Sequence, residues 1–214
     1  VIHWDAVPGV DEYVIKIDNK PFERVKTNQY EIGSGSHSFS VKPVLPKTST
    51  QFYGFSQELN VNVIAQPVIK FDKATKAIIW NRVNDASGYY ITIEKDNKSQ
   101  IDIPPLGREA VSYNGYEFYD VGTYKVKVAC KGDAEANKND SHFAEMEITR
   151  LAAPTLKAVR DDGNRYSIEW NLAPNANLYY VELPNGSRTT SISDTYYTYE
   201  LNKELTERNF TFKV

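Results

Sequence analysis

The sequence predicts an all-β protein built from three tandem β-sandwiches, and three observations lead to this prediction. The opening stretch, VIHWDAVPGVDEYVIKI, recurs twice further along the chain. Each copy has turn-forming residues in its middle and alternating apolar and polar residues after them, which is typical of strands joined by a short loop. The composition agrees, because 15 Tyr residues stand against 1 Met and 1 Cys, and Tyr is enriched in strands.

The three copies align on three tryptophans and agree at six positions. The second copy reads IIWNRVNDASGYYITIE and the third reads SIEWNLAPNANLYYVEL. The aligned residues are, copy by copy, Trp4, Val7, Val10, Tyr13, Ile15 and Ile17; Trp80, Val83, Ala86, Tyr89, Ile91 and Ile93; and Trp170, Ala173, Ala176, Tyr179, Val181 and Leu183. A pattern that recurs at this spacing indicates a repeated structural unit.

The three-residue step from Trp4 to Tyr13 would also suit one face of an amphipathic helix. Turn-forming pairs inside each copy exclude a helix, since an interior Pro costs about 3 kcal/mol and an interior Gly about 1 kcal/mol. These pairs are Pro8-Gly9, Ser87-Gly88 and Pro174-Asn175. Each copy is therefore predicted to be a strand, a loop and a second strand, with a small apolar residue under the loop.

Other alternating segments supply the remaining strands of each unit. Pro-led strands are expected at 66–72 and 153–159, where the first residue tolerates a missing N–H. Later strands are expected at 39–41, 58–63, 124–130, 143–148 and 210–214. Many short strands separated by turns indicate β-sandwiches.

With these residues in place, the sequence resembles the fibronectin type III-like family, particularly its bacterial members. The motif is a Trp followed by V-x-x-A-x-x-Y-x-V-x-I, then a closing Y-x-V-x-V run. In the second unit it comprises Trp80, Val83, Ala86, Tyr89, Ile91 and Ile93, then Tyr124, Val126, Val128 and Ala129. The resemblance implies three fibronectin type III-like domains at 1–64, 65–150 and 151–214. It also implies a structural core motif of Trp4, Tyr13, Trp80, Tyr89, Tyr124, Trp170 and Tyr179.

Compared with the family pattern, both terminal units are incomplete. The first unit lacks a Pro-led first strand, and the third stops inside its expected sixth strand. We therefore expect the native chain to continue in both directions. The junctions at 63–66 and 150–153 are short and contain no Gly, so we expect limited bending and a semi-rigid rod.

The sequence indicates no catalysis and no cofactor. A net charge of −3 argues against nucleic acid as a partner, and no apolar run approaches the roughly 20 residues that span a bilayer. The motifs G-x-S-x-G, G-x-x-x-x-G-K-[ST] and H-E-x-x-H do not occur. His3, His37 and His142 lack zinc-ligand spacing, and we expect three solvated side chains. We therefore expect a chain that is not an enzyme and that has no metal site.

Two further features have a structural and a functional interpretation. Cys130 continues an inward-facing strand pattern and is expected to be a buried, unreactive thiol. The acidic segment 131–140 contains oxygen ligands for calcium, but it lacks the spacing of an EF-hand loop. Because Lys131 and Lys138 would oppose a cation, we expect a mobile, solvated hairpin loop there.

Clusters of aromatic residues are the candidate ligand contacts. The candidates are Phe52, Tyr53, Tyr113 and Tyr116. Residues 196–199 form a matching cluster in the third unit. Alternate residues of a strand point inward, so part of each cluster should pack in the core. Outward members would offer stacking faces for sugars or anchors for a protein.

Two classes of function remain open. The favoured one is a non-catalytic structural or interaction module, a stalk or adhesion-type spacer of a cell-surface or secreted bacterial protein. The alternative is an accessory, carbohydrate-binding region of a secreted glycan-degrading enzyme whose catalytic domain lies elsewhere. The expected location is extracellular or at the cell surface, and the expected partner is a protein or a cell-surface glycan. Sequons at Asn97, Asn139, Asn185 and Asn209 also permit a eukaryotic adhesion ectodomain, although the family's Arg-Gly-Asp tripeptide is absent.

Overall fold

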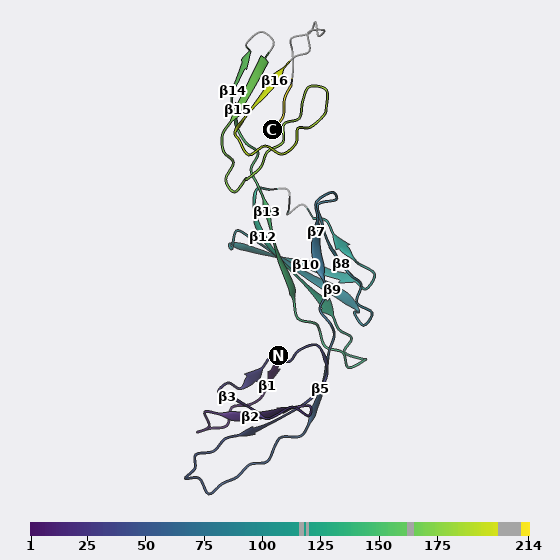
Figure 1. Ribbon diagram of the computed structural model, residues 1–214. Helices are drawn as coiled ribbons and strands as arrows, with labels where there is room; N and C mark the ends of the chain where they lie inside the picture. Colours follow the sequence, from purple (N-terminus) through teal and green to yellow (C-terminus); the bar gives the residue numbers. More distant parts are fainter. Residues whose placement is uncertain (116–117, 119, 162–164, 201–210) are drawn as a thin grey trace. The chain divides into compact units, whose positions relative to one another are not determined.

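The computed structural model describes residues 1–115, 118, 120–161, 165–200 and 211–214. This part of the chain is built from β-strands and contains no α-helix (Figure 1). The all-β prediction is therefore confirmed. A search of the same residues for a helix long and apolar enough to cross a bilayer finds none.

The first repeat places a two-stranded and a four-stranded antiparallel sheet around one core. Its strands are β1 (Ile2–His3), β2 (Tyr13–Ile17), β3 (Glu23–Val25), β4 (Gln29–Tyr30), β5 (Gly35–Pro43) and β6 (Leu59–Val63). The sheets have the orders β1-β4 and β3-β2-β5-β6. Ile2 of the small sheet and Ile15, Ile17 and Phe39 of the large one belong to the same buried cluster, as expected of a sandwich.

The second repeat has the most regular strands. They are β7 (Ile69–Asp72), β8 (Ala77–Trp80), β9 (Gly88–Lys95), β10 (Ser99–Gly107), β11 (Ser112–Tyr113), β12 (Gly122–Lys131) and β13 (Ala144–Arg150). A four-stranded sheet has the order β10-β9-β12-β13, and a three-stranded sheet has the order β11-β8-β7. The inward side chains of β9 and β12 follow the predicted alternation, since Ile91, Ile93, Val126 and Val128 are almost completely buried.

Sequence analysis missed strand β10. The segment contains Pro104 and Pro105, which lack an N–H and argue against a strand. The strand forms because β10 is the edge of its sheet, and the two prolines coincide with a register shift between Ile103 and Leu106. A residue at an edge does not need two hydrogen-bonded neighbours, so Pro is tolerated there.

The third repeat forms a three-stranded sheet with a loosely paired second layer. Its strands are β14 (Leu156–Asp161), β15 (Arg165–Trp170) and β16 (Tyr196–Glu200). The expected second strand of the motif is reduced to isolated bridges at Tyr179 and Glu182. A tight turn follows directly after it, in which Gly186 N donates to Leu183 O. Of the expected strand 210–214, Phe210 lies outside the described residues and Lys213 bridges to Glu182.

The same Trp–Tyr unit occurs in all three repeats. The rings of Trp4 and Tyr13, of Trp80 and Tyr89, and of Trp170 and Tyr179 have centroids 5.5, 5.4 and 5.5 Å apart. These are contact distances for aromatic pairs. In each repeat the Tyr oxygen accepts a hydrogen bond from a backbone N–H six residues earlier, and these donors are Val7, Val83 and Ala173. The same three residues accept the loop-closing bonds from the amides of Val10, Ala86 and Ala176.

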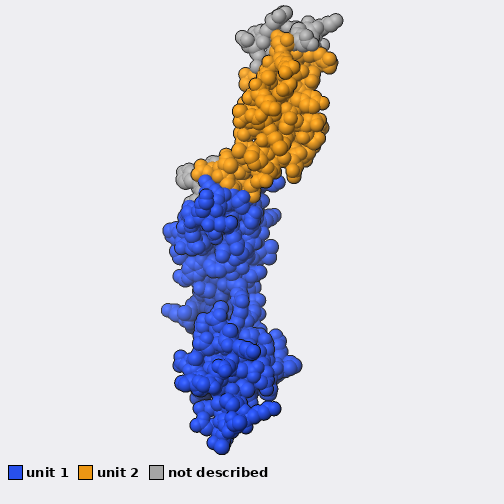
Figure 2. All heavy atoms as spheres, turned by 90° about the vertical axis from the view of Figure 1, so that its left-hand side faces the viewer, with its two compact units in different colours: residues 1–117, 123–148 blue, residues 118–122, 149–214 orange. Residues whose placement is uncertain are grey.

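The chain divides into two compact units, shown in different colours in Figure 2. One comprises residues 1–117 and 123–148, and the other comprises residues 118–122 and 149–214. The first unit contains the first repeat and most of the second, and the other unit contains the third repeat together with residues 118–122 and 149–150 of the second. The domain boundaries at 64/65 and 150/151 remain our proposal.

Candidate aromatic interaction surface

His3 has the solvated environment that the sequence predicts, whereas His37 does not. His3 is exposed, beside buried Ile2. The Nδ1 atom of His37 lies 2.9 Å from a carboxylate oxygen of Asp18, and its Nε2 atom lies 3.3 Å from the Ser34 carbonyl oxygen. The second oxygen of Asp18 accepts a hydrogen bond from Ser38 N. These hydrogen bonds, the one from His37 first, lower the pKa of Asp18 below its ordinary value.

His142 also has two partners, both of them in the first repeat. Its Nε2 atom lies 2.7 Å from the Ile32 carbonyl oxygen, and its Nδ1 atom lies 3.0 Å from a carboxylate oxygen of Glu31. A carbonyl and an ionised carboxylate only accept hydrogen bonds, so both ring nitrogens of His142 lie next to an acceptor. The expectation of three solvated histidines is therefore wrong for two of them. Their partners are distant in sequence, so no local sequence pattern predicts these contacts.

The predicted burial of Cys130 is confirmed. Its side chain is inaccessible, and burial raises the pKa of the thiol to about 11. Thiolate is the nucleophilic form of cysteine, so this environment disfavours reactivity. The backbone N–H of Cys130 donates to the hydroxyl of Ser141, which is also buried.

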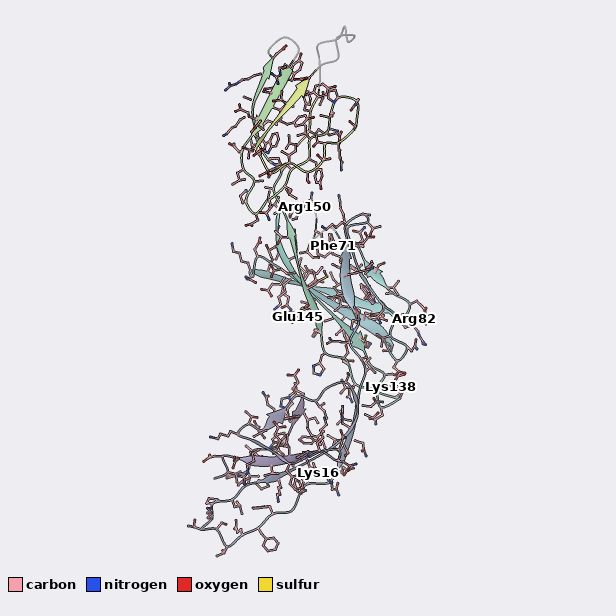
Figure 3. The ribbon with its side chains drawn as sticks, in the orientation of Figure 1. Lys16, Phe71, Arg82, Lys138, Glu145 and Arg150 are labelled. Atoms are coloured by element: carbon pink, nitrogen blue, oxygen red, sulfur yellow. The ribbon has the colours of Figure 1, made fainter. Side chains whose placement is uncertain are left out.

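Internal hydrogen bonds and one ion pair hold the acidic segment 131–140. Asp140 accepts a bond from Gly132 N, and Asp133 accepts bonds from two following amides. Lys138, labelled in Figure 3, pairs with Asp85. Within the described ranges, no group of three or more His, Cys, Asp or Glu residues is placed to hold a metal ion.

The structure separates the predicted aromatic contacts. Phe52 and Tyr53 lie in the loop at 44–58, between β5 and β6, with 91% and 48% of their surfaces exposed. Tyr113 is half-buried on β11, where it pairs with Ile78 of β8. Tyr116 lies outside the described residues. Only Phe52 and Tyr53 are therefore placed together as a surface feature.

Hydrogen bonds attach the loop at 44–58 to β5 and to the segment before β2, where Val44 N donates to the Glu12 carbonyl. Ser56 N donates to the Val41 carbonyl, and Val41 N donates to the Ser56 hydroxyl. Next to this attachment, the ring of Phe55 contacts Phe22, with centroids 5.2 Å apart. The ammonium group of Lys42 lies 4.8 Å from the centre of the Phe55 ring, within the range of a cation–π contact.

We call Phe22, Lys42, Phe52, Tyr53 and Phe55 the aromatic surface. Phe22 is 62% exposed although it contacts Phe55, so this pair presents ring area to solvent. Rings held by a neighbouring ring and a cation suit partner anchoring, because less side-chain freedom is lost on binding. Sequence analysis missed Phe22, Phe55 and Lys42, since loop packing brings them together. The one hint in the sequence was that Phe55 follows Tyr53 by two residues and so extends the predicted aromatic cluster.

The charged residues that follow Phe22 in the chain, Glu23 and Arg24, are of opposite sign. Arg24 of β3 pairs with Glu12 at 2.6 Å, and the hydroxyl of Tyr30 donates to Glu23. Desolvation first, and then the carboxylate of Glu23, raise the pKa of Tyr30.

No family model and no curated protein matches this sequence. Among solved structures, the FN1–FN3 domains of chicken CNTN1 are similar, with 11% identity, 89% of this chain and 78% of that chain covered, and a TM-score of 0.34. The central fibronectin-III array of RIM-binding protein is also similar, with 14% identity and a TM-score of 0.33. The match covers 92% of this chain and 80% of that chain. Both matches are fibronectin type III arrays.

Proposed function

We propose that this chain is a non-catalytic interaction module and spacer of a bacterial cell-surface or secreted protein, and that the aromatic surface contacts a protein partner. The observation that carries this proposal is the Phe22–Phe55–Lys42 cluster, which holds aromatic rings at an exposed position. Exposed aromatic side chains of this kind are enriched among the residues that dominate protein–protein binding energy.

The spacer part of the proposal draws support from the hydrogen bonds between the first two repeats. Asn139 N donates to the Asn62 carbonyl at 2.7 Å, and Ile64 N donates to the Asn139 carbonyl at 3.3 Å. The side chain of Asn139 donates to the same Asn62 carbonyl. Together with the His142 contacts, these bonds connect the repeats without a flexible linker.

Binding measurements with the double variant Phe22→Ala/Phe55→Ala test the contact surface, because these two rings form the cluster that carries the proposal. We expect a member of a panel of purified extracellular proteins to bind the native chain in surface plasmon resonance. The double variant should then bind at least tenfold more weakly, because truncated aromatic anchors cost about 2 kcal/mol or more. Tyr180→Ala is the matched control, since Tyr180 is similarly exposed but belongs to the third repeat. Equal binding by the native chain and the double variant would contradict the proposal.

A second candidate function, an accessory glycan-binding region, is favoured by the 91% exposure of the Phe52 ring. A freely accessible ring can stack on a sugar face. A glycan-array screen of the same proteins separates the two candidates. Glycan binding that disappears in Phe52→Ala, without binding to the protein panel, would favour the second.

Relaxation measurements by NMR test the spacer role. We expect the first two repeats to tumble with one rotational correlation time. His142→Ala with Asn139→Ala removes the side-chain contacts and keeps the backbone bonds of residue 139, so it should move the two values apart only in part. His3→Ala is the control, because His3 is exposed and is not one of the residues that form these bonds. Independent tumbling in the native chain would overturn the spacer role.

A further inference from the structure

We propose that a polar groove of the first unit, distinct from the aromatic surface, binds a neutral oligosaccharide. The groove has a volume of about 440 Å³. It is lined by Asp18, Asn19, Ser36, His37, Ser38, Asn60, Val61, Asn62 and Asn137. Most of these residues belong to the first repeat, and Asn137 comes from the loop of the second repeat that contacts it.

The strand register of β5 and β6 organises the centre of the groove. Ser36 is paired with Asn62, and Ser38 with Asn60. Directly paired residues project from the same face of a sheet, and residues two apart on a strand share that face. Phe39, the next residue of β5, is buried in the core, so the Ser and Asn side chains face away from it. They form an array with spacings of about 5 Å between strands and about 7 Å along them.

The hydrogen-bonding groups of this array are unused within the protein. In the part of the chain that the structure describes, six groove side chains have no hydrogen bond to protein atoms. They are Asn19, Ser36, Ser38, Asn60, Asn62 and Asn137. A carboxamide offers two donors and an acceptor, and a hydroxyl offers both roles. Each sugar hydroxyl likewise donates and accepts, so the two sets of groups are complementary.

The charge of the groove points to a neutral ligand. Its lining contains no Lys or Arg, and its two titratable residues, Asp18 and His37, are paired with each other at 2.9 Å. An anionic sugar would find no unpaired cation, and a cationic ligand would find no unpaired carboxylate. Hydrogen bonding to neutral hydroxyls remains as the source of specificity.

A sugar fits this groove better than an extended peptide does. A peptide that adds to a sheet uses the main-chain groups of an edge strand. At β6, the edge of this sheet, the end of the strand already bridges to Asn139. The free groups of the groove are side chains on the sheet face, which suits a ligand carrying hydroxyls along its length.

Titration of the ¹⁵N-labelled chain with neutral oligosaccharides tests this proposal. The probes are cello-, xylo-, manno- and malto-oligosaccharides, with oligogalacturonate as the acidic comparison and an extended Ser/Thr-rich peptide as the peptide comparison. We expect millimolar or tighter binding of at least one neutral probe, with shifts concentrated at the amides of residues 36–38 and 60–62.

Matched variants locate the site. Asn60→Ala should weaken binding at least tenfold, while Asn177→Ala, an exposed Asn of the third repeat without a partner in the described residues, should leave it unchanged. Unchanged unfolding midpoints and amide spectra would show that both variants fold. Phe22→Ala/Phe55→Ala should not affect this binding, so the result is independent of the proposed protein contact. The proposal is overturned if no neutral probe binds, if Asn60→Ala binds normally, or if the acidic probe or the peptide binds more tightly.

Discussion

The phenol oxygen of Tyr179 accepts a hydrogen bond from the backbone amide of Ala173 at 3.0 Å, while its ring contacts Trp170. The same pair of contacts recurs at Tyr13 and Tyr89. Tyrosine is therefore specified twice at this position: its ring fills the space beside the Trp, and its oxygen satisfies the amide of a loop that has no sheet partner. Phenylalanine could meet only the first requirement.

Tyr179→Phe is expected to destabilise the compact unit that contains the third repeat by about 1–3 kcal/mol, because the buried amide of Ala173 loses its acceptor. Urea unfolding followed by Trp fluorescence measures this change, and faster hydrogen exchange at Ala173 locates it. Tyr180→Phe is the control, since Tyr180 is exposed. Equal stability of the two variants would show that the hydrogen bond contributes nothing.

Gly88 and Gly107 are directly paired across β9 and β10 and should respond differently to Ala. A Cβ atom at Gly88 would lie 2.4 Å from the Leu106 carbonyl oxygen, whereas one at Gly107 would meet no atom within 4 Å. We expect Gly88→Ala to cost about 1–3 kcal/mol through overpacking and Gly107→Ala to be tolerated. Thermal unfolding of both variants checks this, and a similar loss in both would count against the steric explanation.

The pKa of Asp18 should rise toward its ordinary value in His37→Ala, because the His37 hydrogen bond is the largest cause of its lowering. The rise should be incomplete, since Ser38 N still donates to the carboxylate. A folded-state pKa below the unfolded one stabilises the fold above the unfolded value, and this contribution is lost as pH falls through the folded value. Carboxyl ¹³C titration measures the pKa, with His3→Ala as control. An unchanged titration of Asp18 would refute the pairing.

Cys130 should resist thiol reagents at pH 8 in the folded chain and react readily in urea. Its pKa of about 11 leaves little thiolate at that pH, and its side chain is inaccessible. Because the folded pKa is the higher one, the stabilising contribution is complete below the ordinary value of 9.0 and is lost as pH rises toward about 11. Labelling rates followed by mass spectrometry check this expectation, and rapid labelling without denaturant would disprove it.

The alternation of apolar residues predicted the strands well where a strand lies between two regular neighbouring strands, as β12 does between β9 and β13. The inward positions of β12, including Val126 and Val128, follow the pattern because a strand's side chains alternate between two faces. The outward positions carry cross-strand ion pairs instead. Glu145 of β13, labelled in Figure 3, pairs with Lys125 and Lys127 of β12, and these two lysines lower its pKa. Strand β10 was not predicted because it contains Pro104 and Pro105, and Pro is tolerated in a strand only at the edge of a sheet, which the sequence does not reveal.

By itself, the sequence determined the all-β class, the repeat and the inward-facing core, because these depend on periodicity and on residues close together in the chain. The tertiary structure alone decided the partners of the two histidines, the Phe22–Phe55 contact and the groove lined by Asn60 and Asn137. These arrangements join segments that are distant in sequence, so they depend on strand order and on the path of each loop. A local pattern of side chains does not encode either of these, and packing selects them only when the chain folds.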